Sequence, residues 1–196
     1  MAAYSETMIS NLALGKIGAK RINSFDSDIS VEAIACRAHY AQARDALLRS
    51  HVWKFASGRA VLSADAATPS FGFKYQYILP VDFLRLKHVV GRHTHMLEGK
   101  RILTNHDTCK IEYIRRVTDC SEFDPGFVSA LTLALAVELT LPLAGGGAAG
   151  LSLRNQLAAQ LKDVLPKVRL VDVSEDEEED HRLTWLQARR VNLGGR

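Results

Sequence analysis

The spacing of apolar residues changes twice along this 196-residue chain, and this double change limits the possible folds more than any single motif does. Both terminal parts show a helical period, and the middle part alternates at the period of a strand. Helices and strands present different faces to a core, so each change of period marks a boundary between them. The sequence predicts helices at residues 5–17, 30–51, 125–141 and 149–165, and strands within residues 56–118.

We therefore predict an α+β fold: an α-helical bundle with an inserted small antiparallel β domain and an extended C-terminal tail. Burial of the apolar helix stripes against one another is expected to drive folding of the bundle. The runner-up is a purely helical connector with a long β-hairpin arm. The expected parts are the bundle at 1–55 and 119–172, the β domain at 56–118, and an acidic linker with a docking tail at 173–196.

Local signals indicate where the helices begin and end. Ser5 is expected to cap the first helix, and Asp124 followed by Pro125 is typical of the start of the third. Pro142 and Pro166 are expected to end the third and fourth helices, because an interior proline removes a backbone donor. The second-helix stripe that we expect in the core consists of Val31, Ile34, Ala35, Ala38 and Ala41, with Tyr40 and Leu47 beside it.

Two patterns locate strands inside the β region. An alternating aromatic run predicts a strand with one aromatic face. Further along, Gly99 and Lys100 separate two alternating runs, which predicts a hairpin that turns at these two residues. The residues expected on the aromatic face are Phe71, Phe73, Tyr75 and Tyr77.

Trp53 and Phe55 lie where the second helix gives way to the first expected strand. Aromatic side chains at such a boundary can stack on a ligand or bury a large area between two parts of a fold. We predict the second role, an interdomain core, in which truncating either residue is costly.

Motifs that would carry catalysis are weak in this chain. His93 and His95 form an HxH pair without a nearby third ligand, which indicates a surface pair at a hairpin. Gly145, Gly147 and Gly150 fit GxGxxG but follow a helix, so they indicate a flexible connection and not a dinucleotide loop. We predict no enzyme activity, no metal site and no cofactor.

One long apolar segment, residues 127–144, could be taken for a membrane span. It contains a charge at Glu138 and a proline at Pro142, and it lacks flanking basic residues. We therefore predict a buried helix and no association with a membrane.

Six stretches, taken in order, resemble the tail tubular protein A family, the head-to-tail adaptor of short-tailed phages. Their order and spacing over about residues 8–160 carry the resemblance, and no single stretch is specific. The stretches are "ALGKIGAKRINSFDSD", "ARDALLRSHVWKFASGRAVLS", "YQYILPVDFLRLKHV", "EGKRILTN", "IEYIRRVTD" and "FDPGFVSALTLALAVELT".

The resemblance implies a structural protein of the virion, located in the phage neck or tail and made in the host cytoplasm. It implies a helical bundle with an inserted β domain and a homo-oligomeric ring of twelve between the portal protein and the tail nozzle or another tail protein. Genomic DNA would pass through the lumen. We expect the isolated chain to be a monomer that assembles on the portal, because the portal supplies the symmetry.

Contact with DNA is expected to be weak and non-specific, because a net charge of +3 is modest and a conduit must let DNA slide. The alternative is a nucleic-acid-binding phage accessory protein that uses the aromatic and basic β face. That alternative requires one basic groove formed by Lys74, Arg85, Lys87, Arg115 and Arg116.

The tail, residues 173–196, carries six acidic residues and four arginines, and its run "SEDEEED" cannot form a core. An aromatic–arginine mixture follows the run and is typical of interface hot spots. We predict an acidic linker, extended and solvated in the free protein, followed by a peptide that docks on the portal. The residues expected to dock are Arg182, Leu183, Trp185, Leu186, Arg189 and Arg190.

Overall fold

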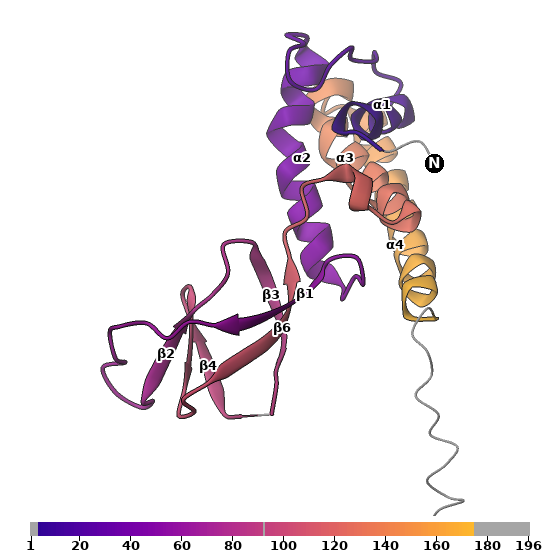
Figure 1. The fold of residues 1–196 in the computed structure, drawn as a ribbon. Helices are drawn as coiled ribbons and strands as arrows, with labels where there is room; N and C mark the ends of the chain where they lie inside the picture. Colours follow the sequence, from indigo (N-terminus) through magenta and orange to yellow (C-terminus); the bar gives the residue numbers. More distant parts are fainter. Residues whose placement is uncertain (1–3, 92, 175–196) are drawn as a thin grey trace, which may run out of the picture.

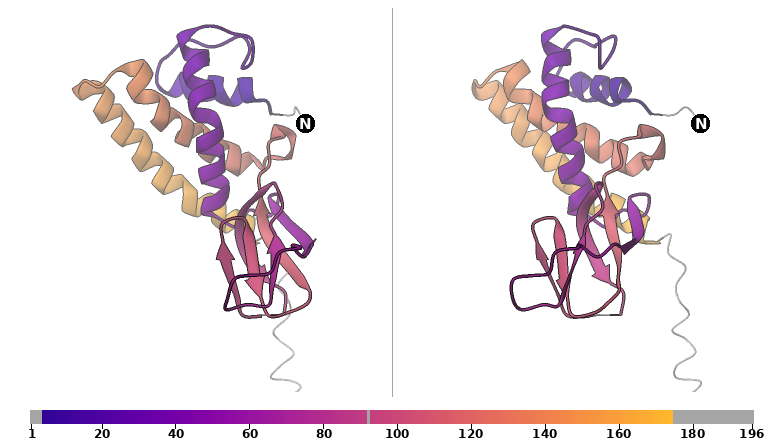
Figure 2. Two further views of the ribbon diagram at one scale, coloured as in Figure 1. Left: turned by 90° about the vertical axis from the view of Figure 1, so that its left-hand side faces the viewer. Right: turned by 60° about the vertical axis from the view of Figure 1, so that its left-hand side comes forward.

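The computed structural model describes residues 4–91 and 93–174. Within these residues the chain forms four α helices, one short 3₁₀ helix and six strands, so the predicted α+β class is confirmed. Helices gather at one end of the molecule and strands at the other (Figures 1 and 2). The elements are α1 Glu6–Lys16, α2 Val31–Ser50, β1 Ser57–Leu62, β2 Tyr75–Ile78, β3 Phe83–Val89, β4 His95–Glu98, β5 Arg101–Thr104, β6 Cys109–Arg115, η1 Cys120–Glu122, α3 Pro125–Ala144 and α4 Ala148–Ser174.

Helix α3 is the central element of the helical region, where α1, α2 and α4 all pack against it. By length and composition alone it could cross a membrane, but 56% of its most apolar window is buried inside the protein. Its one charged residue, Glu138, is exposed, while Leu131, Leu135 and Leu139 have no exposed surface. The prediction of a buried helix at this position is confirmed.

Helix starts follow the sequence signals closely. The Ser5 hydroxyl accepts from Met8 N at 3.2 Å, and the Asp124 carboxylate accepts from two backbone amides of the first turn of α3. Both predicted caps are therefore confirmed. Such side chains satisfy amides that the first turn of a helix leaves without a partner.

The predicted helix ends at the two prolines are wrong. Pro142 lies inside α3, which continues to Ala144, and Pro166 lies inside α4, which continues to Ser174. Apolar residues on both sides of Pro166 pack on the helical core, among them Leu165 and Val168. Tertiary packing of this kind can outweigh the intrinsic cost of an interior proline.

The predicted core stripe of α2 is wrong at most of its positions, although Tyr40 and Leu47, expected beside it, are buried and Ala35 packs partly on the core. Val31 and Ile34 are 69% and 55% exposed, and Ala38 and Ala41 are also exposed. The residues that are buried follow nearly the same spacing as the predicted stripe but start two residues later, which places them roughly 200° around the helix from it. This face carries the bulkier side chains and so removes more apolar area from water. Its members are Ala33, Cys36, Tyr40, Ala43 and Leu47.

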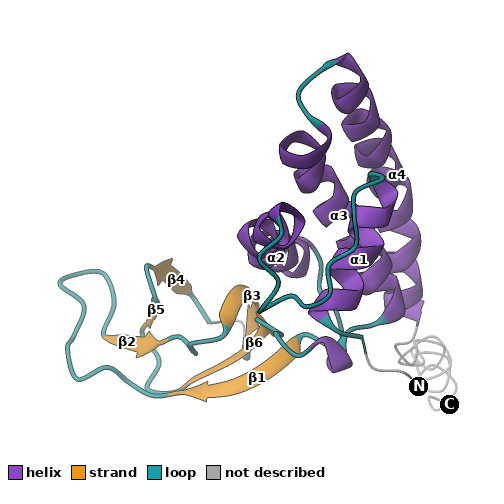
Figure 3. Ribbon diagram, turned by 90° about the horizontal axis from the view of Figure 1, so that it is seen from above, coloured by secondary structure: helices purple, strands orange, loops and turns teal. Residues whose placement is uncertain are grey.

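Two antiparallel three-stranded sheets form the inserted region, with the orders β1-β6-β3 and β2-β5-β4. The predicted hairpin is confirmed: β4 pairs with β5, Glu98 faces Arg101, and the turn falls at Gly99 and Lys100. Viewed from above, the β2-β5-β4 sheet extends away from the helices, while β1, β3 and β6 lie next to them (Figure 3).

The aromatic face expected across residues 71–77 forms only in part. Strand β2 begins at Tyr75, and Phe71 is 85% exposed outside it. Gly72 has a φ of 83°, a left-handed conformation that bends the chain before the strand can start. Phe71 and Phe73 are therefore wrongly assigned to this strand.

Strand β6 takes part in two hydrophobic clusters among the described residues. Its Ile111 and Tyr113 pack in the β region, together with Tyr77 and Ile102. Ile114, at the end of the same strand, belongs to the large helical cluster. The junction of the two regions is thus built into a single continuous strand and the segments beside it.

Candidate functional site

Trp53 lies at the point where the chain leaves α2 for the sheet, and its side chain has no exposed surface. Its ring meets the ring of Phe127 on α3 edge to face, with centroids 5.2 Å apart. The indole N–H donates to Leu47 O at 3.0 Å. With its only polar atom satisfied, the indole serves as packing in the helical core and is not available to stack on a ligand.

Phe55 extends this packing toward the start of α3. Its ring is 5.0 Å from that of Phe127 and 6.0 Å from that of Phe123, and it is only partly buried. The segment that enters the sheet is therefore held against the segment that returns from it. Aromatic pairs of this kind contribute about 0.5–1.5 kcal/mol each beyond the area that they bury.

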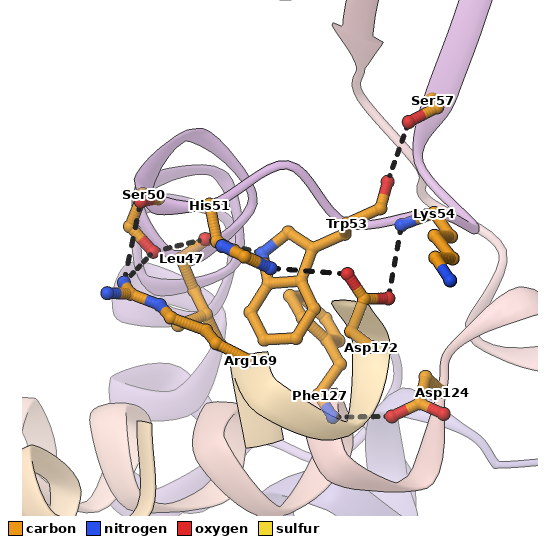
Figure 4. A network of polar contacts seen from close by, with 10 residues as sticks. All are labelled: Leu47, Ser50, His51, Trp53, Lys54, Ser57, Asp124, Phe127, Arg169 and Asp172. Atoms are coloured by element: carbon orange, nitrogen blue, oxygen red, sulfur yellow. Dashed lines mark hydrogen bonds and ion pairs between the residues drawn. The ribbon is translucent and has the colours of Figure 1, made fainter. Parts of the chain in front are cut away.

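A buried carboxylate, Asp172 on the last turns of α4, ties this junction to the other end of the chain (Figure 4). One of its oxygens lies 3.2 Å from His51 Nε2, and the other accepts from the backbone amide of Lys54 at 3.2 Å. One side chain thus holds residues on both sides of Trp53, and it does so across more than a hundred residues of sequence.

His51 is largely buried, and its ring meets that of Trp53 edge to face at 5.0 Å. Burial lowers the pKa of His51 below its ordinary value, although the hydrogen bond to Asp172 opposes this effect. At neutral pH the imidazole is therefore neutral. Because a carboxylate offers no proton, Nε2 carries the hydrogen and donates it to Asp172.

Arg169, one turn before Asp172, makes a second connection. Its guanidinium donates to the Ser50 hydroxyl at 3.0 Å and to the Ser50 carbonyl at 3.4 Å. The two residues fix the end of α4 against the end of α2. We call the group formed by Ser50, His51, Lys54, Arg169 and Asp172 the junction latch.

Sequence reasoning missed the latch. Neither His51, at the predicted end of the second helix, nor Asp172, at the predicted end of the bundle, belongs to a motif. The sequence does contain a signal for a longer helix: apolar residues at helical spacing continue across Pro166, with Leu165 before it and Val168 after it. The partner of Asp172 has no signature in sequence, because the contact is between distant segments.

The arrangement is that of a rigid joint. Its polar groups bind one another and the backbone, except for Arg169 Nε, which is buried without a hydrogen-bond partner among the described residues. Across the described ranges, no group of three or more His, Cys, Asp or Glu side chains is placed to hold a metal. His93 stacks on His106 at 3.5 Å between centroids, while His95 Nδ1 lies 2.8 Å from the carbonyl of His93.

The basic residues proposed for a nucleic-acid groove are largely paired within the chain. Lys87 lies 3.3 Å from Glu112, Arg116 Nε lies 2.7 Å from Asp45, and Arg115 pairs with Glu122. These carboxylates cancel charge that phosphate contacts would need.

The aromatic residues that the nucleic-acid alternative requires are not all accessible either. Tyr77 is 2% exposed, and its hydroxyl donates to His106 O at 2.9 Å. Tyr75, by contrast, is 39% exposed. Base stacking requires an accessible ring face, and a run of accessible faces is missing from this strand.

The residues expected to dock on the portal lie outside the described residues. Helix α4 brings the chain as far as Ser174, and the latch fixes its last described turns beside residues 50–54. The docking prediction therefore stays a prediction. It concerns Arg182, Leu183, Trp185, Leu186, Arg189 and Arg190.

Comparison with known proteins gives no family: no protein-family model matches the chain, and no curated protein matches it.

Proposed function

We propose that this chain is a structural protein of the virion, a head-to-tail connector adaptor that forms a twelve-fold ring between the portal and the tail. The phage-adaptor resemblance of its ordered motifs motivates the proposal. An α-helical region with an inserted β region, the architecture expected from that resemblance, is consistent with it. DNA would pass through the lumen of the ring with weak, non-specific contacts.

The observation that carries the proposal is the exposed apolar stripe at the start of α2. Ile29, Val31 and Ile34 are 89%, 69% and 55% exposed. Clustered exposure of large apolar side chains marks surfaces that bind other proteins. Val31 and Ile34 lie three residues apart on one face of α2, Ile29 precedes the helix, and the described part of the chain leaves all three largely exposed. We assign it to the lateral contact with a neighbouring copy in the ring.

The junction latch supports the same function. A ring between two large assemblies must keep its helical and β regions in a fixed relation while DNA passes. Buried aromatic packing and a buried carboxylate with two partners provide such a relation at the point where the regions meet. The nucleic-acid alternative is less well supported, because internal ion pairs use much of the charge that it requires.

The test is the mass of the full chain, measured by light scattering with and without a purified portal ring from the same genome. At physiological ionic strength we expect a monomer alone and twelve copies per portal in the mixture. Failure to bind the portal at all would overturn the proposed function. A stable dodecamer formed alone at low concentration would contradict assembly on the portal.

A variant tests the lateral contact separately. Ile34→Lys places a charge on the exposed stripe of α2 without touching the core, so the chain should remain folded. We expect fewer than twelve copies on the portal at concentrations that saturate the wild type. Gln156→Lys, which adds the same charge at an exposed position of α4, is the control and should fill the ring. Equal occupancy by both variants would remove α2 from the interface.

A further inference from the structure

A groove of about 670 Å³ lies between β3 and the β4–β5 hairpin, beside the end of α2. Its floor includes apolar residues that are open to solvent: Ile78, Val81 and Leu97 are 51%, 99% and 47% exposed. Every charged residue among the described residues that line the groove is basic and exposed. These residues are Arg49, Arg85, Lys100 and Arg116.

Three of these four basic residues form no ion pair within the part of the chain that the structure describes. Arg116 is paired with Asp45, but Arg85 donates to a backbone carbonyl, that of Arg49, at 3.2 Å. No carboxylate of the described chain forms an ion pair with Arg49, Arg85 or Lys100. An apolar floor with an unpaired cationic rim favours an occupant that carries several negative charges and an apolar side chain.

The chain itself contains a segment of this chemistry. Residues 175–180 are six consecutive acidic residues, and Leu183 is the first apolar residue after them. We propose that the groove binds residues 175–183 of a neighbouring copy of the chain, so that each subunit in the ring holds the tail of the next. The proposal rests on the ring proposed above and identifies one of its contacts.

The geometry favours a neighbouring copy over the same copy. Helix α4 ends on one side of α2, whereas the β2-β5-β4 sheet and its hairpin lie on the other side (Figures 1 and 3). The last turn of α2 separates them: Ser50 contacts Arg169 of α4, and Arg49 lines the groove. Donor and acceptor on different sides of a subunit make a head-to-tail contact, the type that closes into rings.

Chain length sets an upper limit on the distance between the end of α4 and the groove of the neighbouring copy. Residues 175–183 span at most roughly 30 Å when fully extended, about the length of a 20-residue helix. Residues from Trp185 onward stay available for the portal, whereas Arg182 and Leu183, which the docking prediction also includes, would lie at the groove instead.

Zero-length coupling of amines to carboxylates tests the contact without the portal. Full-length chain labelled with ¹⁵N is mixed with unlabelled chain at low ionic strength, coupled and digested for mass spectrometry. We expect mixed-label links between Lys100 and residues 175–180. Lys20 and Lys110 are also exposed but lie outside the groove, so they should form few such links. Links within one copy only, or equal linking of all three lysines, would overturn the proposal.

Exchanging the charges of the groove and the tail is the second test of the contact. Arg85→Glu with Lys100→Glu should abolish weak self-association at low salt, as should replacing the three glutamates at 177–179 with lysine. An equal mixture of the two variants should recover it, because each groove then meets a tail of opposite charge. Lys20→Glu with Lys110→Glu changes the net charge equally and should associate like the wild type. A mixture that stays monomeric in sedimentation, or a control that loses association, would overturn the proposal.

The outcomes separate this inference from the proposed function. A chain that fails to bind portal but forms the mixed-label links keeps the groove contact and loses the adaptor role. A chain that fills the portal ring without such links keeps the adaptor role and loses the groove contact.

Discussion

Replacing Trp53 with alanine tests the junction at its most buried point. The side chain has no exposed surface, and its removal leaves a cavity between α2, α3 and the connection to β1. Truncating a buried aromatic residue costs ~3–5 kcal/mol, which combines lost transfer energy with the cavity left behind. Loss of the edge-to-face contact with Phe127 is part of that figure. Trp53→Ala should therefore lose about 3–5 kcal/mol of unfolding free energy.

Trp53→Phe separates packing from the hydrogen bond. Phenylalanine keeps an aromatic ring beside Phe127 but removes the donor to Leu47 O. That carbonyl still accepts from the Ser50 hydroxyl at 2.7 Å, so it does not become an unpaired buried acceptor. We expect this variant to lose about 1–3 kcal/mol of unfolding free energy, because it lacks the hydrogen bond to Leu47 O and its ring is smaller.

Urea unfolding followed by far-ultraviolet circular dichroism measures these losses, since the signal does not depend on the tryptophan removed. Trp185→Ala is the matched control: it makes the same replacement in the predicted docking tail and should leave the midpoint unchanged. A loss below about 1.5 kcal/mol for Trp53→Ala would refute the assignment of this residue to the core.

Three other predictions concern the latch and the tail. Asp172→Ala leaves the Lys54 amide without its acceptor and should cost about 1–3 kcal/mol, with faster hydrogen exchange near the end of α4. Burial lowers the pKa of His51 in the folded state, so the unfolded chain binds this proton first as the pH falls. Stability, measured as the urea midpoint, should therefore decrease as the pH drops below 6.5. His51→Gln should make the midpoint depend less on pH in this range. Deleting residues 175–196 should keep the wild-type melting curve but weaken portal binding in pull-down titrations; unchanged affinity would contradict the docking hypothesis.

Local chemistry explains why much of this fold was predictable. Ser5 and Asp124 satisfy the first amides of their own helices, and the turn at Gly99 and Lys100 follows from two adjacent residues. Signals of this kind act over a few positions, so they survive without knowledge of the rest of the fold.

Long-range packing explains the failures. Helix α2 has two apolar faces with the same spacing, and periodicity cannot say which one meets α3; the larger Tyr40 and Leu47 decide it. Pro166 is accommodated because residues on both sides of it pack on the core. The contact between Asp172 and His51 likewise depends on where α4 ends in space, which no local pattern encodes.

Electron cryomicroscopy of the portal incubated with the full chain tests the central claim most directly. The account predicts a single ring of twelve copies on the portal axis, with an open lumen and the α2 stripe at the contact between neighbours. Copies bound off the axis, a different copy number, or a ring in which Ile34 faces solvent would contradict it.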